Sequence, residues 1–159
     1  LLRRHESEDI FGLQIAVPWP DQARTFGRLM EESGHHFDFI DLNCACPVDA
    51  ICRYGVGACL LDTPKKIEGL SRAISKASSR PITIKVRIGR DEKKPVLHKW
   101  LHELKDWGLA AWTIHGRSRM QRYTKLADWD YVGRCARDAP IPTFGSGDIF
   151  QHTEWYEHI

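Results

Sequence analysis

The run PITIKVRI at residues 81–88 places apolar and polar side chains in strict alternation, with Ile82, Ile84 and Val86 opposed to Thr83, Lys85 and Arg87. A period of two puts these two sets on opposite faces of a β-strand, so Lys85 and Arg87 share one face. Working outward, the sequence predicts further strands at residues 11–17, 37–43, 111–115 and 141–144. Amphipathic stretches predict helices between them at residues 20–32, 63–76, 95–107 and 128–139, and a last helix from about residue 150.

A helix in nearly every gap between strands is typical of a parallel α/β fold. The chain has no glycine fingerprint of the Rossmann type, which favours a TIM (β/α)8-type barrel over a doubly wound sheet. A full barrel needs eight units and about 250 residues, whereas this sequence supplies five. We therefore expect a single α/β domain over residues 1–159 that is a partial TIM barrel, with a smaller open sheet as the alternative.

The composition restricts location and partners. The net charge is only +2, so a nucleic-acid contact would have to come from a local basic patch. No apolar run approaches the roughly 18 residues that span a bilayer, and the start lacks a secretory signal, so no membrane partner is expected. Five cysteines, an odd number, favour a reducing compartment, and we expect the cytoplasm and also the nucleus. The sequence lacks an initiator methionine and is interpreted as a segment of a longer protein.

Polar residues gather where the predicted strands end, which is where barrel enzymes carry out their chemistry. Lys85 could face water on an edge strand, or it could hold an electron-rich ligand inside the barrel. His115 could be structural or functional. The glycine-rich turn FGSGDI offers backbone N–H groups to a phosphate, although such turns are common in α/β proteins. The candidates are Gln14, Asn43, Lys85, His115 and the turn residues Gly145, Ser146 and Gly147.

Four of the five cysteines lie in residues 41–61, DLNCACPVDAICRYGVGACLL. Zinc sites usually contain paired C-x2-4-C knuckles, which this segment lacks, so no metal is expected. Cys44 and Cys59 are interpreted as small buried hydrophobic residues, Cys135 as a packing residue, and Cys52 is left open. Cys46 follows a strand end directly and is a candidate nucleophile or acid.

Several motifs in order resemble the tRNA-dihydrouridine synthase family. They are DLNCACP, GVGACLL, ITIKVRIG, TIHGRS and FGSGDI. The segment HGRSRMQRYTKLADWDY and the opening RRHESEDIFGLQIA resemble the eukaryotic class that acts on uridine 47 of tRNA. The resemblance runs through nearly the whole chain, and the order of the motifs makes it far more specific than any one of them.

The resemblance implies an FMN enzyme on a TIM barrel that reduces uridine in tRNA to 5,6-dihydrouridine with NADPH as reductant. Cys46 would supply a proton to C5 of the uracil. Gln14, Lys85 and His115 would contact the flavin, Asn43 would orient the flavin or the uracil, and the turn at residues 145–147 would hold its phosphate. The RNA-binding residues would be Arg87, Arg117, Arg119, Arg122 and Lys125, the last four within a stretch, residues 113–127, that has no acidic residue.

The sequence departs from the family pattern in three ways. Ala45 replaces the usual glycine before the cysteine, which would cost about 1 kcal/mol if that position needs φ > 0. Ser146 replaces an asparagine in the phosphate turn. The first strand, the last two barrel strands and the C-terminal helical RNA-binding domain have no counterpart, so we expect an open sheet with exposed edges that by itself is not a competent enzyme. The alternative functions are another FMN-dependent barrel oxidoreductase on a small substrate, and a non-catalytic RNA-binding fragment.

Overall fold

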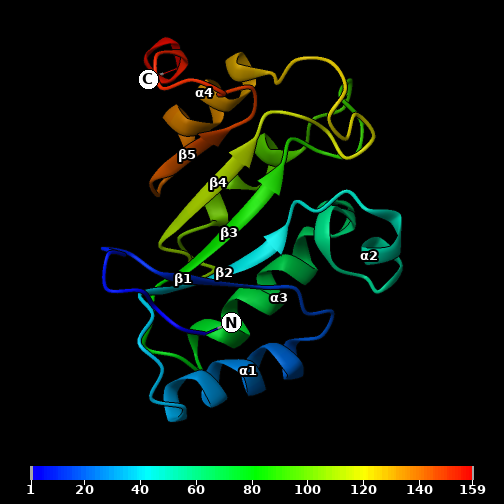
Figure 1. The fold of residues 1–159 in the computed structure, drawn as a ribbon. Helices are drawn as coiled ribbons and strands as arrows, with labels where there is room; N and C mark the ends of the chain where they lie inside the picture. The colour runs from blue at the N-terminus through cyan, green and yellow to red at the C-terminus, as the bar shows by residue number, and fades with distance from the viewer. Residues whose placement is uncertain (1, 159) are drawn as a thin grey trace.

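The computed structural model describes residues 2–158, which form one layer of parallel strands with helices packed on one face (Figure 1). The strands are β1 (Gly12–Ile15), β2 (Phe39–Cys44), β3 (Ile82–Arg87), β4 (Ala111–His115) and β5 (Thr143–Ser146). They pair in chain order, β1-β2-β3-β4-β5, and every pair is parallel. Strands that follow one another in sequence and in space, with a crossover between each pair, form a partial TIM barrel. The predicted fold class is confirmed.

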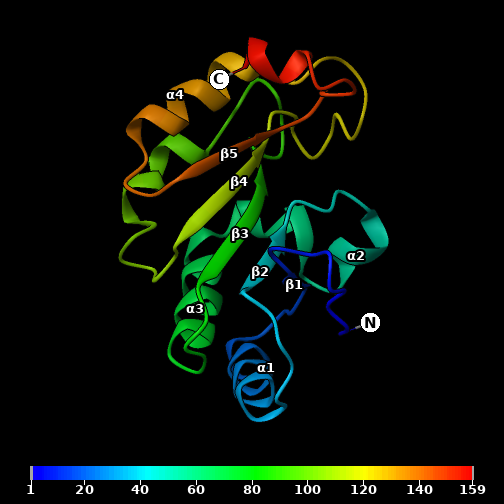
Figure 2. The ribbon, with the colours of Figure 1, turned by 60° about the vertical axis from the view of Figure 1, so that its left-hand side comes forward.

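The helices are α1 (Pro20–Glu32), α2 (Asp49–Arg53), α3 (Pro64–Ser75) and α4 (Trp129–Asp138). Helices α1 and α3 pack against each other on one side of the sheet, and α4 lies against β5 (Figures 1 and 2). Pro20 and Pro64 occupy first-turn positions, where a missing N–H costs nothing. Asp128 caps α4 by accepting a hydrogen bond from the Tyr131 N–H at 2.8 Å. The boundaries of α1, α3 and α4 agree closely with the sequence prediction.

The core lies between the sheet and these helices, and alternation along each strand decides which residues enter it. Ile82, Ile84 and Val86 of β3 are at most 1% exposed and face the helices. Thr83 and Lys85 alternate with them and point to the opposite, inner face. On this face Phe144 remains 61% exposed, so the interior of the partial barrel is open, as the strand count predicts.

Three sequence predictions of secondary structure were wrong. Residues 95–107 form two short 3-10 turns, Leu97–Lys99 and Leu101–Glu103, rather than one α-helix. Trp100, between the turns, has φ −140° and ψ 0°, and its indole stacks on Trp107 with centroids 5.3 Å apart. Burying these large side chains against the sheet overrides the local preference for a regular helix.

The last strand is displaced by two residues, because pairing with β4 begins at Thr143 and ends at Ser146. Gly145 and Ser146 therefore belong to the strand rather than to the turn.

The last helical segment is only a 3-10 turn, Glu154–Glu157. Two more elements were missed, because α2 and a 3-10 helix over Gly57–Asp62, η1, lie within the expected cysteine loop. No helix in the described part of the chain is long and apolar enough to cross a membrane.

Candidate functional site

The inner face of the sheet carries a connected row of polar side chains that crosses β1, β2 and β3. The Gln14 Nε2 donates to Asp41 Oδ2 at 2.7 Å, and the Asn43 Nδ2 donates to Gln14 Oε1 at 2.9 Å. The Thr83 hydroxyl donates to the other Asp41 oxygen at 2.6 Å. Each amide and carboxylate is thus oriented by a neighbour. Asp41 and Thr83 were not among the predicted site residues, although their period-two spacing from Asn43 and Lys85 could have identified them.

Lys85 lies beside this row, next to Asn43 and Thr113 in the strand register. Its ammonium donates to Ser146 Oγ at 3.2 Å. Burial lowers the pKa of Lys85, and the negative charge of Asp41 only partly opposes this shift. A desolvated cation with a neutral hydroxyl as partner suits an electron-rich or anionic ligand on the inner face.

His115 lies two residues further along the sheet than Lys85, because it pairs with Arg87, and on its other side it pairs in register with Ser146. Burial lowers its pKa to about 4, and the positive charges of Arg87, Lys85 and Arg117 act in the same direction. His115 is therefore neutral at pH 7, so one ring nitrogen donates a hydrogen bond and the other accepts one. It lies within contact of the glycine turn, because a Cβ on Gly147 would be 3.3 Å from His115 Nε2.

The backbone around Cys46 is held from two sides. The Asn43 Oδ1 accepts hydrogen bonds from the Ala45 N–H at 3.2 Å and the Cys46 N–H at 3.0 Å. The Cys46 carbonyl accepts from the Ala58 N–H at 2.9 Å. Gly57, at φ +74°, packs so closely that a Cβ there would lie 2.7 Å from the Cys46 oxygen. Ala45 is not among the residues with positive φ, so the strain expected for an alanine at this position does not arise.

Arg87 is buried at 2% exposure and ties two loops together. Its guanidinium donates to the Ala45 carbonyl at 2.9 Å, immediately before Cys46. It also donates to the carbonyls of Ser118 and Arg122, at 2.9 and 2.6 Å. One cation thereby joins the loop that carries Cys46 to the basic loop, which follows β4 and contains Arg117, Arg119, Arg122 and Lys125.

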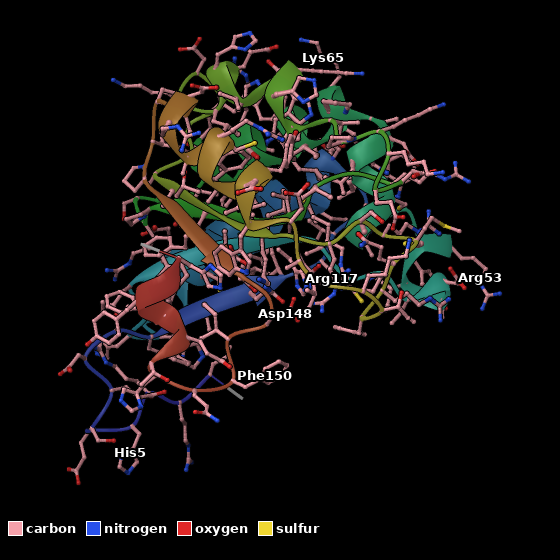
Figure 3. All side chains as sticks on the ribbon, turned by 90° about the horizontal axis from the view of Figure 1, so that it is seen from above. His5, Arg53, Lys65, Arg117, Asp148 and Phe150 are labelled. Carbon is pink, nitrogen blue, oxygen red and sulfur yellow. The ribbon has the colours of Figure 1, made fainter. Side chains whose placement is uncertain are left out.

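Arg117, 7% exposed, organises the same basic loop from its other side. It donates to the Lys125 carbonyl at 2.9 Å and forms an ion pair with Asp148. Figure 3, in which the molecule is seen from above relative to Figure 1, shows Arg117 and Asp148 close together. Arg87 and Arg117 were predicted to bind RNA. In the structure both side chains are buried and make hydrogen bonds within the protein, and RNA binding by these two residues stays a prediction.

The other three predicted RNA-binding residues lie at the surface of this loop, and each meets an acid from elsewhere in the chain. Arg119 and Arg122 form ion pairs with Asp49 of α2, at 3.5 and 2.6 Å. Lys125 forms an ion pair with Glu92. The charge of the basic stretch is thus partly balanced by acidic residues far away in sequence.

The structure explains why glycine occupies positions 145 and 147 of the predicted phosphate turn. A Cβ on Gly145 would be 2.2 Å from the Trp129 ring. Gly147 has φ +120°, a conformation that favours glycine, and its carbonyl accepts from Trp129 Nε1 at 3.1 Å. Gly147 follows the last residue of β5, Ser146, which accepts a hydrogen bond from Lys85 and pairs with His115.

The five cysteines are all free thiols with different surroundings. Cys44 and Cys135 are buried, at 0% and 1% exposure, as expected for packing residues. Cys59 was expected to be buried but is only partly so, and its thiol donates to the Val56 carbonyl at 3.2 Å. Within residues 2–158, no three His, Cys, Asp or Glu side chains come together in a way that could hold a metal ion.

Together these features define a class: a partial (β/α) barrel whose strand ends present a lysine, a histidine and a loop cysteine. Residues 2–159 match the family described as Dihydrouridine synthase (Dus), and the chain belongs to this family.

Among similar curated proteins, a tRNA-dihydrouridine(47) synthase (NAD(P)+)-like protein of Oryza sativa subsp. japonica is 44% identical over 162 residues, covering 100% of this chain and 23% of the relative. Proteins with the same description from Xenopus tropicalis and Homo sapiens are 42% and 43% identical, covering 97% and 94% of this chain. The chain spans about a quarter of the length of these relatives.

Proposed function

We propose that this chain forms the FMN-binding catalytic part of an enzyme that reduces uridine in tRNA to 5,6-dihydrouridine, with NADPH as reductant. The observation that carries the proposal is the arrangement of Asn43, Lys85 and Cys46. One asparagine side chain orients the cysteine backbone at the rim, while a partly desolvated lysine lies next to it on the inner face. Similarity to the tRNA-dihydrouridine(47) synthase-like proteins supports the substrate and the nicotinamide reductant.

The residues on the inner face fit a flavin. Lys85 carries a positive charge that stabilises negative charge on a reduced ring system, and Gln14 and His115 supply neutral hydrogen-bonding groups. The backbone at residues 145–147 would hold the phosphate. When bound, FMN supplies the hydride that reaches C6 of the uracil.

Cys46 acts from the rim of the site. Thiols are largely protonated at neutral pH and can act as general acids, and here the thiol would donate its proton to C5 of the uracil. The Asn43 side chain and the Ala58 N–H hold the backbone on both sides of that thiol in place. The chemical step thus depends on a loop that the chain positions by hydrogen bonds from two different elements.

The first test uses a chimera in which residues 1–159 replace the matching segment of the Oryza sativa relative. We expect the chimera to retain a yellow flavin chromophore and to form dihydrouridine in tRNA with NADPH. Lys85→Ala should lower flavin occupancy after dialysis, because it removes the cation of the inner face. Lys65→Ala, an exposed lysine on α3 seen at the molecular surface in Figure 3, is the matched control. Equal flavin occupancy in both variants would contradict the assignment of Lys85.

The second test concerns tRNA binding by Arg119 and Arg122. Exchanging both for glutamate should weaken binding of tRNA and flatten the log–log salt slope by about 0.7 to 0.9 for each phosphate that the protein no longer neutralises. Asp49→Asn should act in the opposite direction and strengthen binding about two- to fivefold, because it releases two guanidinium groups from an exposed ion pair.

Arg24→Glu provides the control for this test, since Arg24 is an exposed arginine of α1, outside the basic loop. Filter binding over a series of salt concentrations measures the tRNA affinity of each variant and its salt slope. An unchanged slope in the double variant, or weaker binding by Asp49→Asn, would assign the loop to the solvent-exposed surface instead of the RNA interface.

A further inference from the structure

Cys52 and Cys59 lie in a tight reversal of the chain next to Cys46. Cys52 lies in the last turn of α2, the chain turns back at Gly55 and Gly57, both at φ +74°, and Cys59 follows in η1. The Gly55 N–H and the Cys59 thiol both reach the Cys52 carbonyl, at 2.9 and 3.5 Å. The turn therefore brings the Cys59 thiol to the backbone of Cys52, and both residues are partly accessible to solvent.

The two thiols also influence each other chemically. Burial raises the pKa of the Cys59 thiol, and the adjacent Cys52 thiol raises it further, whereas Arg119 and Lys66 act in the opposite direction. Lys66 reaches the same turn, because its ammonium donates to the Gly55 carbonyl at 3.1 Å. The net direction is a raised pKa, so Cys59 is the resolving partner of the pair and not the thiol that meets an oxidant first.

This pair is connected directly to the backbone of Cys46. The Cys52 Sγ donates to the Cys46 carbonyl at 3.8 Å, and the Ala58 N–H, next to Cys59, donates to the same oxygen at 2.9 Å. Gly57 packs against the Cβ of Cys46. Any change in the Cys52–Cys59 pair is therefore transmitted to the residue proposed as the acid.

We propose that Cys52 and Cys59 form a reversible disulfide under peroxide, and that this oxidation loosens the backbone of Cys46. One thiolate attacks a peroxide oxygen, the O–O bond breaks, and a sulfenic acid and water result once the leaving oxygen is protonated. The second thiol then displaces the sulfenic hydroxyl as a second water, and the S–S bond forms. The two sulfurs lose two electrons together, and the peroxide takes them up.

The consequence for Cys46 follows from the hydrogen-bond donor that oxidation removes. A disulfide sulfur has no proton, so the Cys52 hydrogen bond to the Cys46 carbonyl disappears. The geometry that the bridge imposes also moves η1 relative to α2, which disturbs the contacts of Ala58 and Gly57 with Cys46. Of the three remaining cysteines, Cys44 and Cys135 cannot substitute in this pair, because they are buried away from solvent.

The experiment treats the chain of residues 1–159, and the chimera in parallel, with hydrogen peroxide, followed by alkylation and non-reducing peptide mass analysis. We expect a Cys52–Cys59 cross-link with loss of two hydrogens, reversed by dithiothreitol. The alkylation rate of Cys46 by iodoacetamide should increase about two- to tenfold on oxidation, the range that the loss of one hydrogen bond produces.

Two variants serve as controls. Cys52→Ser retains a hydroxyl donor for the Cys46 carbonyl but cannot form the bridge, and Cys59→Ser removes the other partner. In both, Cys46 alkylation should no longer respond to peroxide. A Cys46–Cys52 cross-link, free Cys52 and Cys59 at peroxide concentrations that oxidise Cys46, or a Cys46 response that survives in Cys59→Ser would overturn the proposal. None of these measurements uses flavin or RNA, so they are independent of the proposed enzymatic function.

Discussion

Replacing Cys46 by alanine in the chimera is expected to lower the rate of uridine reduction by about 10²–10⁴, the usual contribution of a positioned general acid. Flavin content and reduction of the flavin by NADPH should stay the same, because hydride transfer to the flavin does not involve the thiol. Dihydrouridine formation under single-turnover conditions measures the first quantity, and anaerobic bleaching of the flavin absorbance measures the second.

Cys44→Ala is the matched control for this prediction. Cys44 lies two residues away, is fully buried and faces the helices. Its loss should destabilise the fold by about 1–3 kcal/mol and reduce activity only in proportion to unfolding. Full uridine reduction by Cys46→Ala together with a large specific loss in Cys44→Ala would show that the wrong thiol has been assigned.

Arg87→Met is expected to produce a large loss of stability, about 2–4 kcal/mol in the free energy of unfolding. The guanidinium satisfies three backbone carbonyls, and each buried acceptor left without a donor costs about 1–3 kcal/mol, less where water can reach it. Methionine fills part of the volume of the side-chain stem but donates no hydrogen bond. Urea titration monitored by tryptophan fluorescence measures the change.

Lys85→Met supplies the comparison, two residues away on the same face of β3. Among residues 2–158, its ammonium has the Ser146 hydroxyl as its one hydrogen-bond partner, and burial of the charge lowers its pKa. We expect a change of less than about 1 kcal/mol in stability, because removing a desolvated charge offsets the lost hydrogen bond. Equal losses in the two variants would show that Arg87 is not the tie between the loops.

Much of the fold was predictable because strands and helices depend on local patterns. The strand Ala111–His115 was predicted to the residue, and β3 differs by only one residue at each end. Alternation along these strands also correctly placed Lys85 and Arg87 on the face opposite the apolar core. The order of strands follows from crossover connections between neighbours, which the spacing of the elements already indicates.

The failures occurred where distant groups outweigh the local pattern. Residues 95–107 have a helical pattern, but stacking of Trp100 on Trp107 and contact with Trp112 stabilise separate 3-10 turns. The strand at residues 141–144 was displaced because pairing with β4, and not propensity, sets its register. Neither effect can be seen in a window of a few residues.

For the site, the sequence alone determined which residues stand at the strand ends, because a period of two and a glycine or proline after each strand are local features. The tertiary structure decided what those residues do. Arg87 and Arg117 are buried, where they donate hydrogen bonds to carbonyl groups of the loops. Asp49, some 70 residues away in the chain, forms ion pairs with Arg119 and Arg122. Hydrogen bonds and ion pairs between loops depend on distances in space, and the folded sheet alone establishes those distances.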